Sequence, residues 1–442
     1  MLQGRIPLAH IHRPESWIGA YLLSCGFQHL LVLPFFGEKF QLPECIFLLG
    51  LPLTMRWWAS NPRRGDNSPR HRVFFVSVLC WCLVHCFSFA CHPSLDGFLE
   101  SLGVIYLAVL CLWIQRLAIH IPAAELPAFG VRAFGWQGWA MTLTALVAYL
   151  LALGGVANEA AQCYVCFPYF GDVYRLQGFT TTPALYLSAI TLSIGFVLGD
   201  ALSRDNGRQA VFAAGLFTLV AVLTFAKSFL YVIFLWVALL ARRSGRSSLR
   251  VAFVGIVLTI VHCVATHLLI QAVEQTQRSV DPSGPYTTNE RLFVFGDVTL
   301  VKTGYYALKR AAWQLFAENP WTGTGPGNFN RALAGLKTAG AYPGHLPDFD
   351  PHGSYTGALA TLGLLGLLAL LACGIALFRI VAGLPADDPF RYLFIALLAI
   401  MAAEAISMDV MNFRHYWALA GLILAWKGER VGEKPEPPLA VS

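Results

Sequence analysis

The sequence predicts an all-α integral membrane protein with about twelve transmembrane helices. Of its 442 residues, 56% are hydrophobic and only 13% are charged, whereas soluble domains carry about 25% charged residues. The mean hydropathy is +0.58. Apolar stretches of about 20 residues cross a bilayer as helices, because hydrocarbon offers no partner to open backbone groups. One long polar interval interrupts them, from about Pro282 to Gly366.

Twelve segments fit transmembrane helices. They lie near 17–36, 43–58, 73–92, 97–118, 135–155, 182–203, 209–226, 228–241, 251–272, 354–380, 391–410 and 413–426. We divide each of the regions 209–241 and 391–426 into two helices because Lys227 and Arg414 lie at their turning points. Region 209–241 could instead form one bent helix. The residues before the first segment lack the apolar core of a secretory signal, so we expect that segment to be an uncleaved anchor.

The basic residues predict how the helices are oriented in the membrane. With both termini in the cytoplasm, the inner loops contain most of the Lys and Arg residues, whereas the outer turns hold chiefly Lys39, Lys227 and Arg414. This asymmetry follows the positive-inside rule and explains the net charge of +6 without nucleic acid as a partner. The predicted regions are helices 1–9 (1–272), a loop region on the outer side (273–353), helices 10–12 (354–426) and a cytoplasmic tail (427–442).

The outer interval contains the residues that suit chemistry. An imidazole accepts a proton near neutral pH, and His352 stands two residues after Asp350 at the start of a predicted helix. His345 is the rival base. The run of Gly323, Gly325 and Gly327 allows either close approach to a ligand or close packing of a loop, and it is no P-loop because no Lys-Ser/Thr pair follows.

Outward-facing cations indicate an anionic substrate at the membrane surface. Guanidinium groups bind phosphate oxygens through paired donors, so a lipid diphosphate is one candidate ligand and lipid headgroups are the other. The cations are Arg175, Arg291, Lys302, Lys309 and Arg310. The outer face has no nucleotide pool, so a substrate there must arrive already activated.

Three further features each have a structural alternative. Asp348 and Asp350 have the spacing of some metal-binding pairs, but the pattern is short and we predict no metal site and no cofactor. Cys163 and Cys166 suit a disulfide or half of a metal site, with a structural role favoured. Glu404 lies within an apolar segment, where it fits either a proton pathway or a hydrogen-bonded structural site.

Together, these segments resemble the O-antigen ligase and polymerase superfamily of bacterial envelope glycosyltransferases. The similarity lies in Arg-x-x-Gly-Phe at 175–179, the Ala-Trp-Gln-Leu-Phe-Ala-Glu-Asn-Pro-Trp-Thr-Gly-Thr-Gly run at 312–325, Pro-His followed by Leu-Gly-Leu-Leu-Gly within 351–366, and Arg-His-Tyr-Trp at 414–417. The motifs cover about residues 170–425, and the first five spans match only in hydropathy.

The resemblance implies a GT-C glycosyltransferase fold that acts on an undecaprenyl-diphosphate-linked glycan at the periplasmic face. An O-antigen ligase transfers this glycan to lipid A-core oligosaccharide in lipopolysaccharide biosynthesis, with inversion and without metal or ATP. By position, His352 matches the base and Arg175 the first diphosphate ligand. Tyr305 stands where the family has a second arginine, so Arg291 or Arg310 would replace it; Gly353 stands where Asn is common.

The same resemblance leaves other functions open. An O-antigen polymerase uses the same donor with a second lipid-linked glycan as acceptor. A protein O-oligosaccharyltransferase and a transporter of lipid-linked glycans are the further alternatives. The ligase is the reading that the sequence favours.

Overall fold

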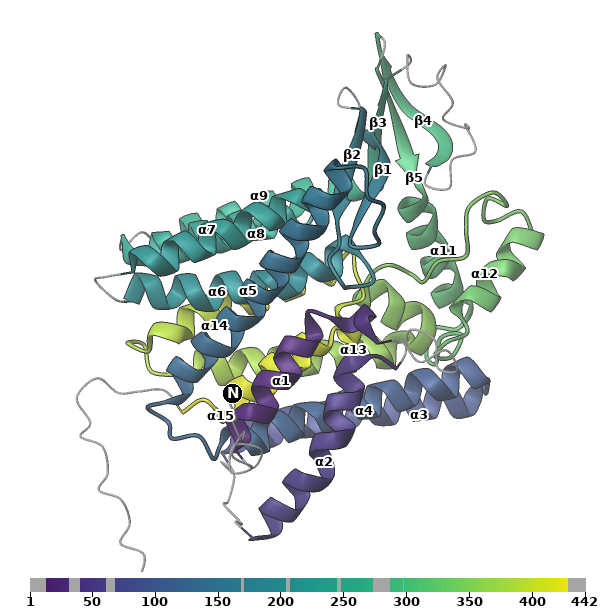
Figure 1. Cartoon of the computed structure of the whole chain (residues 1–442). Coiled ribbons are helices and arrows are strands. Elements are labelled where there is room, and N and C mark those ends of the chain that lie inside the picture. Colours follow the sequence, from purple (N-terminus) through teal and green to yellow (C-terminus); the bar gives the residue numbers. More distant parts are fainter. Residues whose placement is uncertain are drawn as a thin grey trace, which may run out of the picture.

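The computed structural model describes residues 13–31, 40–60, 68–167, 171–203, 207–244, 248–272, 287–296 and 298–427. Long helices run side by side, and two small sheets and two further helices gather at one end of them (Figure 1). The chain begins with α1 (Pro14–Cys25), the 3₁₀ turn η2 (Gln28–Leu30), α2 (Leu42–Ser60), α3 (Pro69–Cys91), α4 (Leu95–Ala118), α5 (Leu126–Leu153), β1 (Ala161–Phe167) and β2 (Gly171–Leu176). It continues with α6 (Pro183–Ser203), α7 (Arg208–Leu223), α8 (Phe229–Arg243), α9 (Ser248–His267), β3 (Leu268–Ala272), β4 (Thr287–Phe295), β5 (Val298–Thr303), α11 (Gly304–Glu318), α12 (Phe329–Thr338), α13 (Ser354–Ala382), α14 (Pro389–Glu404), the turn η4 (Val410–Asn412) and α15 (Arg414–Ala425).

The predicted class, a mostly helical multi-pass membrane protein, is confirmed. Within the described residues, six helices are long and apolar enough to cross a bilayer: α3, α4, α5, α6, α9 and α13. Several other predicted spans coincide with shorter helices. α7 has 16 residues, or about 24 Å, against about 30 Å of hydrocarbon. Twelve crossings and the GT-C arrangement therefore stay predictions.

Both helix breaks that the sequence placed at single charged residues, Lys227 and Arg414, are present. Residues 224–228 separate α7 from α8, and residues 405–413, including η4, separate α14 from α15. The first predicted span is only partly described, because residues 32–39 lie outside the described ranges. The same holds for 428–442 of the predicted tail and for 273–286 of the outer loop.

Within the described residues, five strands accompany the helices. β1 and β2 form an antiparallel pair, and β3, β5 and β4 form an antiparallel sheet with β5 in the centre. The sequence placed residues 268–272 in the ninth span, but they form β3. Hydropathy alone could not separate them, because Leu268, Leu269 and Ile270 continue the apolar run of α9, whereas their pairing with β5 depends on residues 30 positions later in the chain.

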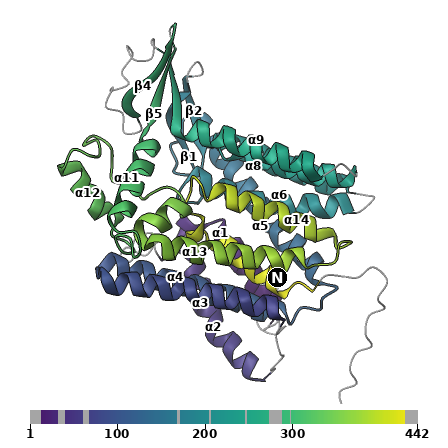
Figure 2. The same ribbon diagram turned by 180° about the vertical axis from the view of Figure 1, so that it is seen from behind.

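Two apolar cores hold these parts together. The larger core fills the bundle, where α3 packs against α13 and α4 against α15 (Figure 2). The smaller core joins α11, α12 and the start of α13 through residues such as Leu308, Leu333 and Ala360. It fixes the position of the α13 N-terminus, where the predicted base stands.

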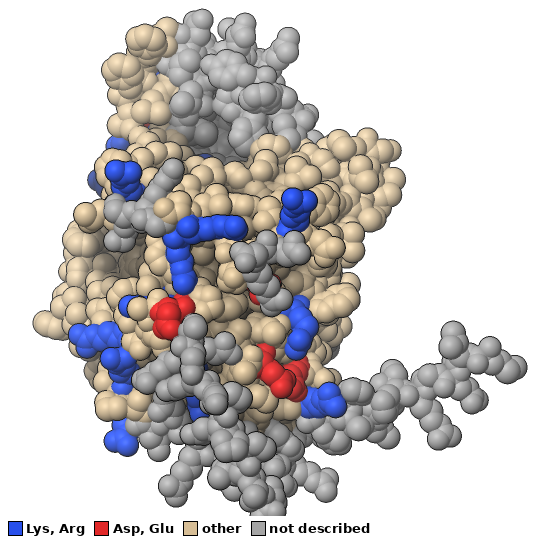
Figure 3. Space-filling model, turned by 90° about the vertical axis from the view of Figure 1, so that its left-hand side faces the viewer, with Lys and Arg blue, Asp and Glu red and all other residues tan. Residues whose placement is uncertain are grey.

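Charge is unevenly distributed along the helices. At the end opposite α11 and α12, Lys and Arg side chains outnumber acidic ones over the visible face (Figure 3). Helix ends there carry Arg116, Arg208, Arg242, Arg243 and Arg379. This face is the one that the sequence assigns to the cytoplasm.

Candidate functional site

The glycine-rich turn after α11 is a packing element. Gly323, Gly325 and Gly327 have φ values of +64°, +91° and +68°, and a Cβ on Gly323 would lie 2.3 Å from the Thr361 carbonyl carbon. The turn fills a break in α13 at Gly363, where the Leu364 amide donates to the Pro320 carbonyl over 2.8 Å. Close packing, one of the two readings of this run, is therefore what the structure shows.

His352 lies at the entrance of α13 in an unusual backbone conformation. Its φ is +41°. Within the described residues, His352 and Phe225 are the only residues other than glycine with a positive φ. Such strain in a residue that is not glycine often accompanies function. The imidazole lies between Tyr305 and Phe349, with ring centroids 4.9 and 5.5 Å away. The side chain stays 31% exposed, so a substrate can reach it.

The chemistry of His352 is set by Asp350 and by burial. Nδ1 lies 3.3 Å from Oδ1 of Asp350, and the backbone amide of His352 donates to the same oxygen over 3.2 Å. Burial lowers the pKa of His352 below 6.5; Asp350 partly offsets this, and Lys309 adds to it. The ring is therefore neutral at pH 7. With Nδ1 directed to Asp350, Nε2 is the nitrogen that can accept a proton.

Lys309 of α11 ties the site together. Its Nζ donates to the carbonyl of His352, to Oγ1 of Thr356 over 2.7 Å and to the carbonyl of Ile406 over 2.9 Å. These partners belong to the start of α13 and to the segment after α14. Burial lowers the pKa of Lys309 to about 8, although Asp350 acts in the opposite direction. An ammonium group thus holds the backbone of His352 in place.

A pair of cations, Arg175 and Lys227, lies at the turn between α7 and α8. Nε of Arg175, on β2, donates to the carbonyl of Thr224 over 3.1 Å. Phe225, with its φ of +45°, is the next residue, and Lys227 follows in the same turn. The Lys227 side chain reaches the surface, yet burial of its ammonium, together with the smaller effect of the Arg175 charge, lowers its pKa to about 8.

His267 connects the pair of Arg175 and Lys227 with Lys309. This last residue of α9 lies within electrostatic range of both Lys227 and Lys309. A line of basic groups therefore runs from Arg175 through Lys227, His267 and Lys309 to the backbone of His352. Such a line can bind a polyanion that reaches from one end to the other.

The other predicted cations occupy more open positions. Arg291 lies on β4 opposite Val301, and Arg310 follows Lys309 on α11; both side chains are exposed. Their role as diphosphate ligands stays a prediction. The rival base His345 is exposed in the turn after α12.

Asp348 and Asp350 contact different basic residues. Asp348 forms an ion pair with Lys337 over 2.6 Å, whereas Asp350 contacts His352. In the described part of the chain, no group of three or more His, Cys, Asp or Glu residues is placed to hold a metal ion. Cys163 lies on β1, and its side chain and that of Cys166 fall outside the described ones.

Glu404 has the hydrogen bonds of a structural residue. Its Oε2 accepts from the hydroxyl of Tyr416 over 2.6 Å and from that of Ser188 over 3.4 Å. The residue is 1% exposed. It joins α6, α14 and α15, which favours the structural reading over a proton pathway.

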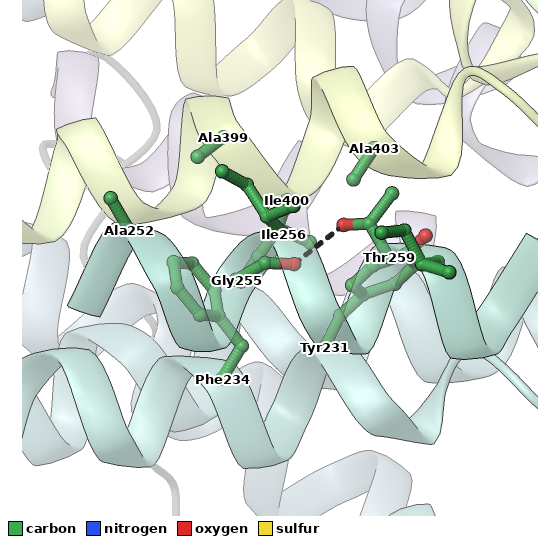
Figure 4. Close-up of a pocket in the computed structure, with 10 residues that line it drawn as sticks. Tyr231, Phe234, Ala252, Gly255, Ile256, Thr259, Ala399, Ile400 and Ala403 are labelled. Atoms are coloured by element: carbon green, nitrogen blue, oxygen red, sulfur yellow. Dashed lines mark hydrogen bonds between the residues drawn. The ribbon is translucent and has the colours of Figure 1, made fainter. Parts of the chain in front are cut away.

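An apolar cavity of about 330 Å³ opens between α8, α9 and α14 (Figure 4). Tyr231, Phe234, Ile256 and Ile400 are among its lining residues. Thr259 is one of its few polar lining residues, and its hydroxyl donates to the carbonyl of Gly255 within α9 over 2.8 Å. Tyr231 lies in the first turn of α8, four residues after Lys227 in the chain.

From the sequence, Lys227 marked a helix break but had no predicted role in the site. Lys309 could not be distinguished from the other cations of the outer interval. Lys227 was visible as a single charge between two apolar helices. Lys309 was one of several cations in the outer interval, and its burial depends on how α11 packs against α13. No local pattern distinguishes it from Arg310.

These features define a class of protein: a multi-pass membrane protein with a basic, partly buried site at one end of its helices and an apolar cavity beside it. Residues 210–371 match the family model described as O-antigen ligase. The segment includes Lys227, Lys309 and His352. This part of the chain is therefore similar to the O-antigen ligase family, as its motifs indicated. No curated protein matches it.

Proposed function

We propose that this protein is an O-antigen ligase. It transfers a glycan from undecaprenyl diphosphate to a sugar hydroxyl of lipid A-core oligosaccharide, with inversion and without metal or ATP. The observation that carries the proposal is the neutral imidazole of His352, held at the α13 entrance beside the line of basic groups. The family match supports ligase- or polymerase-type transfer in lipopolysaccharide synthesis.

His352 acts as the general base in this reaction. Nε2 takes the proton of the acceptor hydroxyl while the acceptor oxygen bonds to the anomeric carbon. The bond from that carbon to the diphosphate oxygen breaks, and undecaprenyl diphosphate leaves with the electron pair. Attack opposite the leaving group inverts the anomeric carbon. A positioned base contributes a factor of about 10²–10⁴ to such a rate.

The line of basic groups receives the leaving diphosphate. Arg175 and Lys227 are the proposed ligands, because they lie together and are fixed by the strained turn at Phe225. Arg291 and Arg310 are the further candidates. Positive charge that is already in place stabilises the charge that develops on the leaving oxygen.

The apolar cavity receives the first part of the donor's prenyl chain. It is lined almost wholly by apolar side chains, and one of them, Tyr231, follows Lys227 by four residues in the chain. A diphosphate at Lys227 and a chain in the cavity would thus belong to one bound molecule. Holding both substrates in one orientation at the membrane surface supplies much of the rate gain without a soluble cofactor.

The site faces the periplasm in this proposal, with both termini in the cytoplasm of the inner membrane. The support is the arginine-rich face at the opposite end of the helices (Figure 3). Basic residues concentrate in cytoplasmic loops.

A gene deletion separates the candidate functions. Loss of a ligase leaves polymerised glycan on the lipid carrier together with unsubstituted lipid A-core. If the deletion instead leaves core bearing a single repeat unit, the protein is a polymerase. Normal lipopolysaccharide with glycan missing from proteins would indicate a protein O-oligosaccharyltransferase, and lipid-linked glycan retained on the cytoplasmic face would indicate a transporter.

A further inference from the structure

We infer that the tip of the β4–β5 hairpin lies in the lipid–water interface beside the bundle and contacts membrane phospholipid. The tip consists of Leu292, Phe293, Val294 and Phe295 at the end of β4, and these four consecutive apolar residues are 47%, 62%, 56% and 75% exposed. In an aqueous setting, such a run on the edge strand of a sheet would favour aggregation. An apolar medium at the tip removes that liability.

The position of the sheet indicates which apolar medium this is. β3 continues directly from His267, the last residue of α9. Both ribbon views show β3, β4 and β5 turned across the direction of α9 and extending beyond the side of the bundle (Figures 1 and 2). A span that ends at the membrane surface and continues into strands across its own direction places those strands along that surface.

The lipid-facing character of α9 supports the same placement. Only 17% of its apolar window is buried in the protein, against 83% for α6. Phe253, Ile256 and Ile260 on α9 are 57% or more exposed. The hairpin therefore extends from the side of the bundle that contacts lipid, not from a face covered by other helices.

Charge and backbone geometry set the depth of the tip. At the base of the hairpin, Lys302 forms a 2.6 Å ion pair with Glu290, and its ammonium lies 4.6 Å from the ring centroid of Tyr306. Lys and Tyr residues are typical of the headgroup level. β4 is an edge strand, so its outer backbone groups need water or headgroups as partners. Insertion is thus shallow, with the Phe rings below the headgroups and the backbone at their level.

Photocrosslinking tests this placement. The full-length protein carrying Phe295→p-benzoylphenylalanine is reconstituted into vesicles of phosphatidylethanolamine and phosphatidylglycerol and irradiated. Lipid adducts on the labelled peptide are then measured by mass spectrometry. Phe253→p-benzoylphenylalanine on the lipid face of α9 is the positive control. Ala334→p-benzoylphenylalanine on the exposed side of α12 is the control for a site in water.

We expect position 295 to form lipid adducts at half or more of the yield at position 253, and severalfold above that at position 334. Because the Phe295 side chain is 75% exposed, the substitution leaves the core unchanged. A lipid yield equal to that of position 334 would overturn the inference. So would crosslinking between two copies of the chain in place of lipid, because β4 would then pair with a second sheet edge.

Discussion

Lys309→Met is the substitution that best separates stability from function in this site. The ammonium of Lys309 donates to three acceptors, the carbonyls of His352 and Ile406 and the hydroxyl of Thr356. Methionine keeps the length and apolar stem of the side chain but loses its charge and its donors. The backbone of His352, with its φ of +41°, then loses a tether.

Two opposing terms set the change in folding free energy. Burial lowers the pKa of Lys309 from 10.5 to about 8. At about 1.36 kcal/mol per unit, the charged form costs about 3 kcal/mol, which methionine recovers. The three acceptors that lose their partner each cost about 1–3 kcal/mol, and carbonyls are at the low end. We expect a net loss of at most about 2 kcal/mol, so the protein still folds.

The effect on catalysis is larger. The variant loses a cation near the leaving group and the support of the base, and we expect kcat to fall about 10²-fold, with a smaller change in the KM of the donor. Arg331→Met on the exposed side of α12 is the matched control and should keep the normal rate.

The dependence of kcat on pH gives a readout that a purely structural role of Lys309 would not change. In the parent protein, activity should rise as His352 loses its proton at a pKa below 6.5 and fall as Lys309 loses its proton near pH 8. Because the pKa of Lys227 is also about 8, Lys309→Met should reduce the alkaline fall and keep the acid limb, and the double variant Lys227→Met/Lys309→Met should remove the alkaline fall. An unchanged alkaline limb, or a normal kcat in the variant, would refute this role.

Three further predictions follow from contacts in and around the site. Arg175→Ala should raise the KM of the donor at least tenfold, on the order of one lost charged hydrogen bond, and equal KM values in a steady-state assay would contradict its role. Ala403→Trp fills the apolar cavity, so transfer from a full-length prenyl donor should fall while a short-chain analogue reacts normally; an equal loss with both donors would exclude a prenyl site there. Arg414→Met leaves Glu44 buried without its cation and should cost about 3–5 kcal/mol in thermal unfolding, whereas the double variant Glu44→Met/Arg414→Met should recover most of the loss.

Part of this site could be predicted from the sequence because the signals are local. A histidine after Asp350 at the start of an apolar helix indicated His352, and single charges at Lys227 and Arg414 indicated the helix breaks. The family motifs at 312–325 and 351–366 predicted a resemblance to the O-antigen ligase family, and the family model matches residues 210–371.

The rest depends on contacts between distant segments. Glu44 and Arg414 form a buried ion pair across 370 positions, so neither residue alone indicated the other. Lys309 meets the Ile406 carbonyl only because α11 packs against α13. The strand at 268–272 shares the hydropathy of α9 and is separated from it only by pairing with β5.

The central claim is tested most directly by reconstituted transfer. Purified protein in lipid is given undecaprenyl-diphosphate-linked glycan and lipid A-core, with EDTA and without nucleotide, and the product is followed by gel electrophoresis. We expect transfer by the parent protein and a fall of about 10²–10⁴-fold in His352→Ala, with donor binding retained. No product without a divalent ion, or a normal rate in His352→Ala, would contradict a metal-independent ligase that uses this histidine as its base.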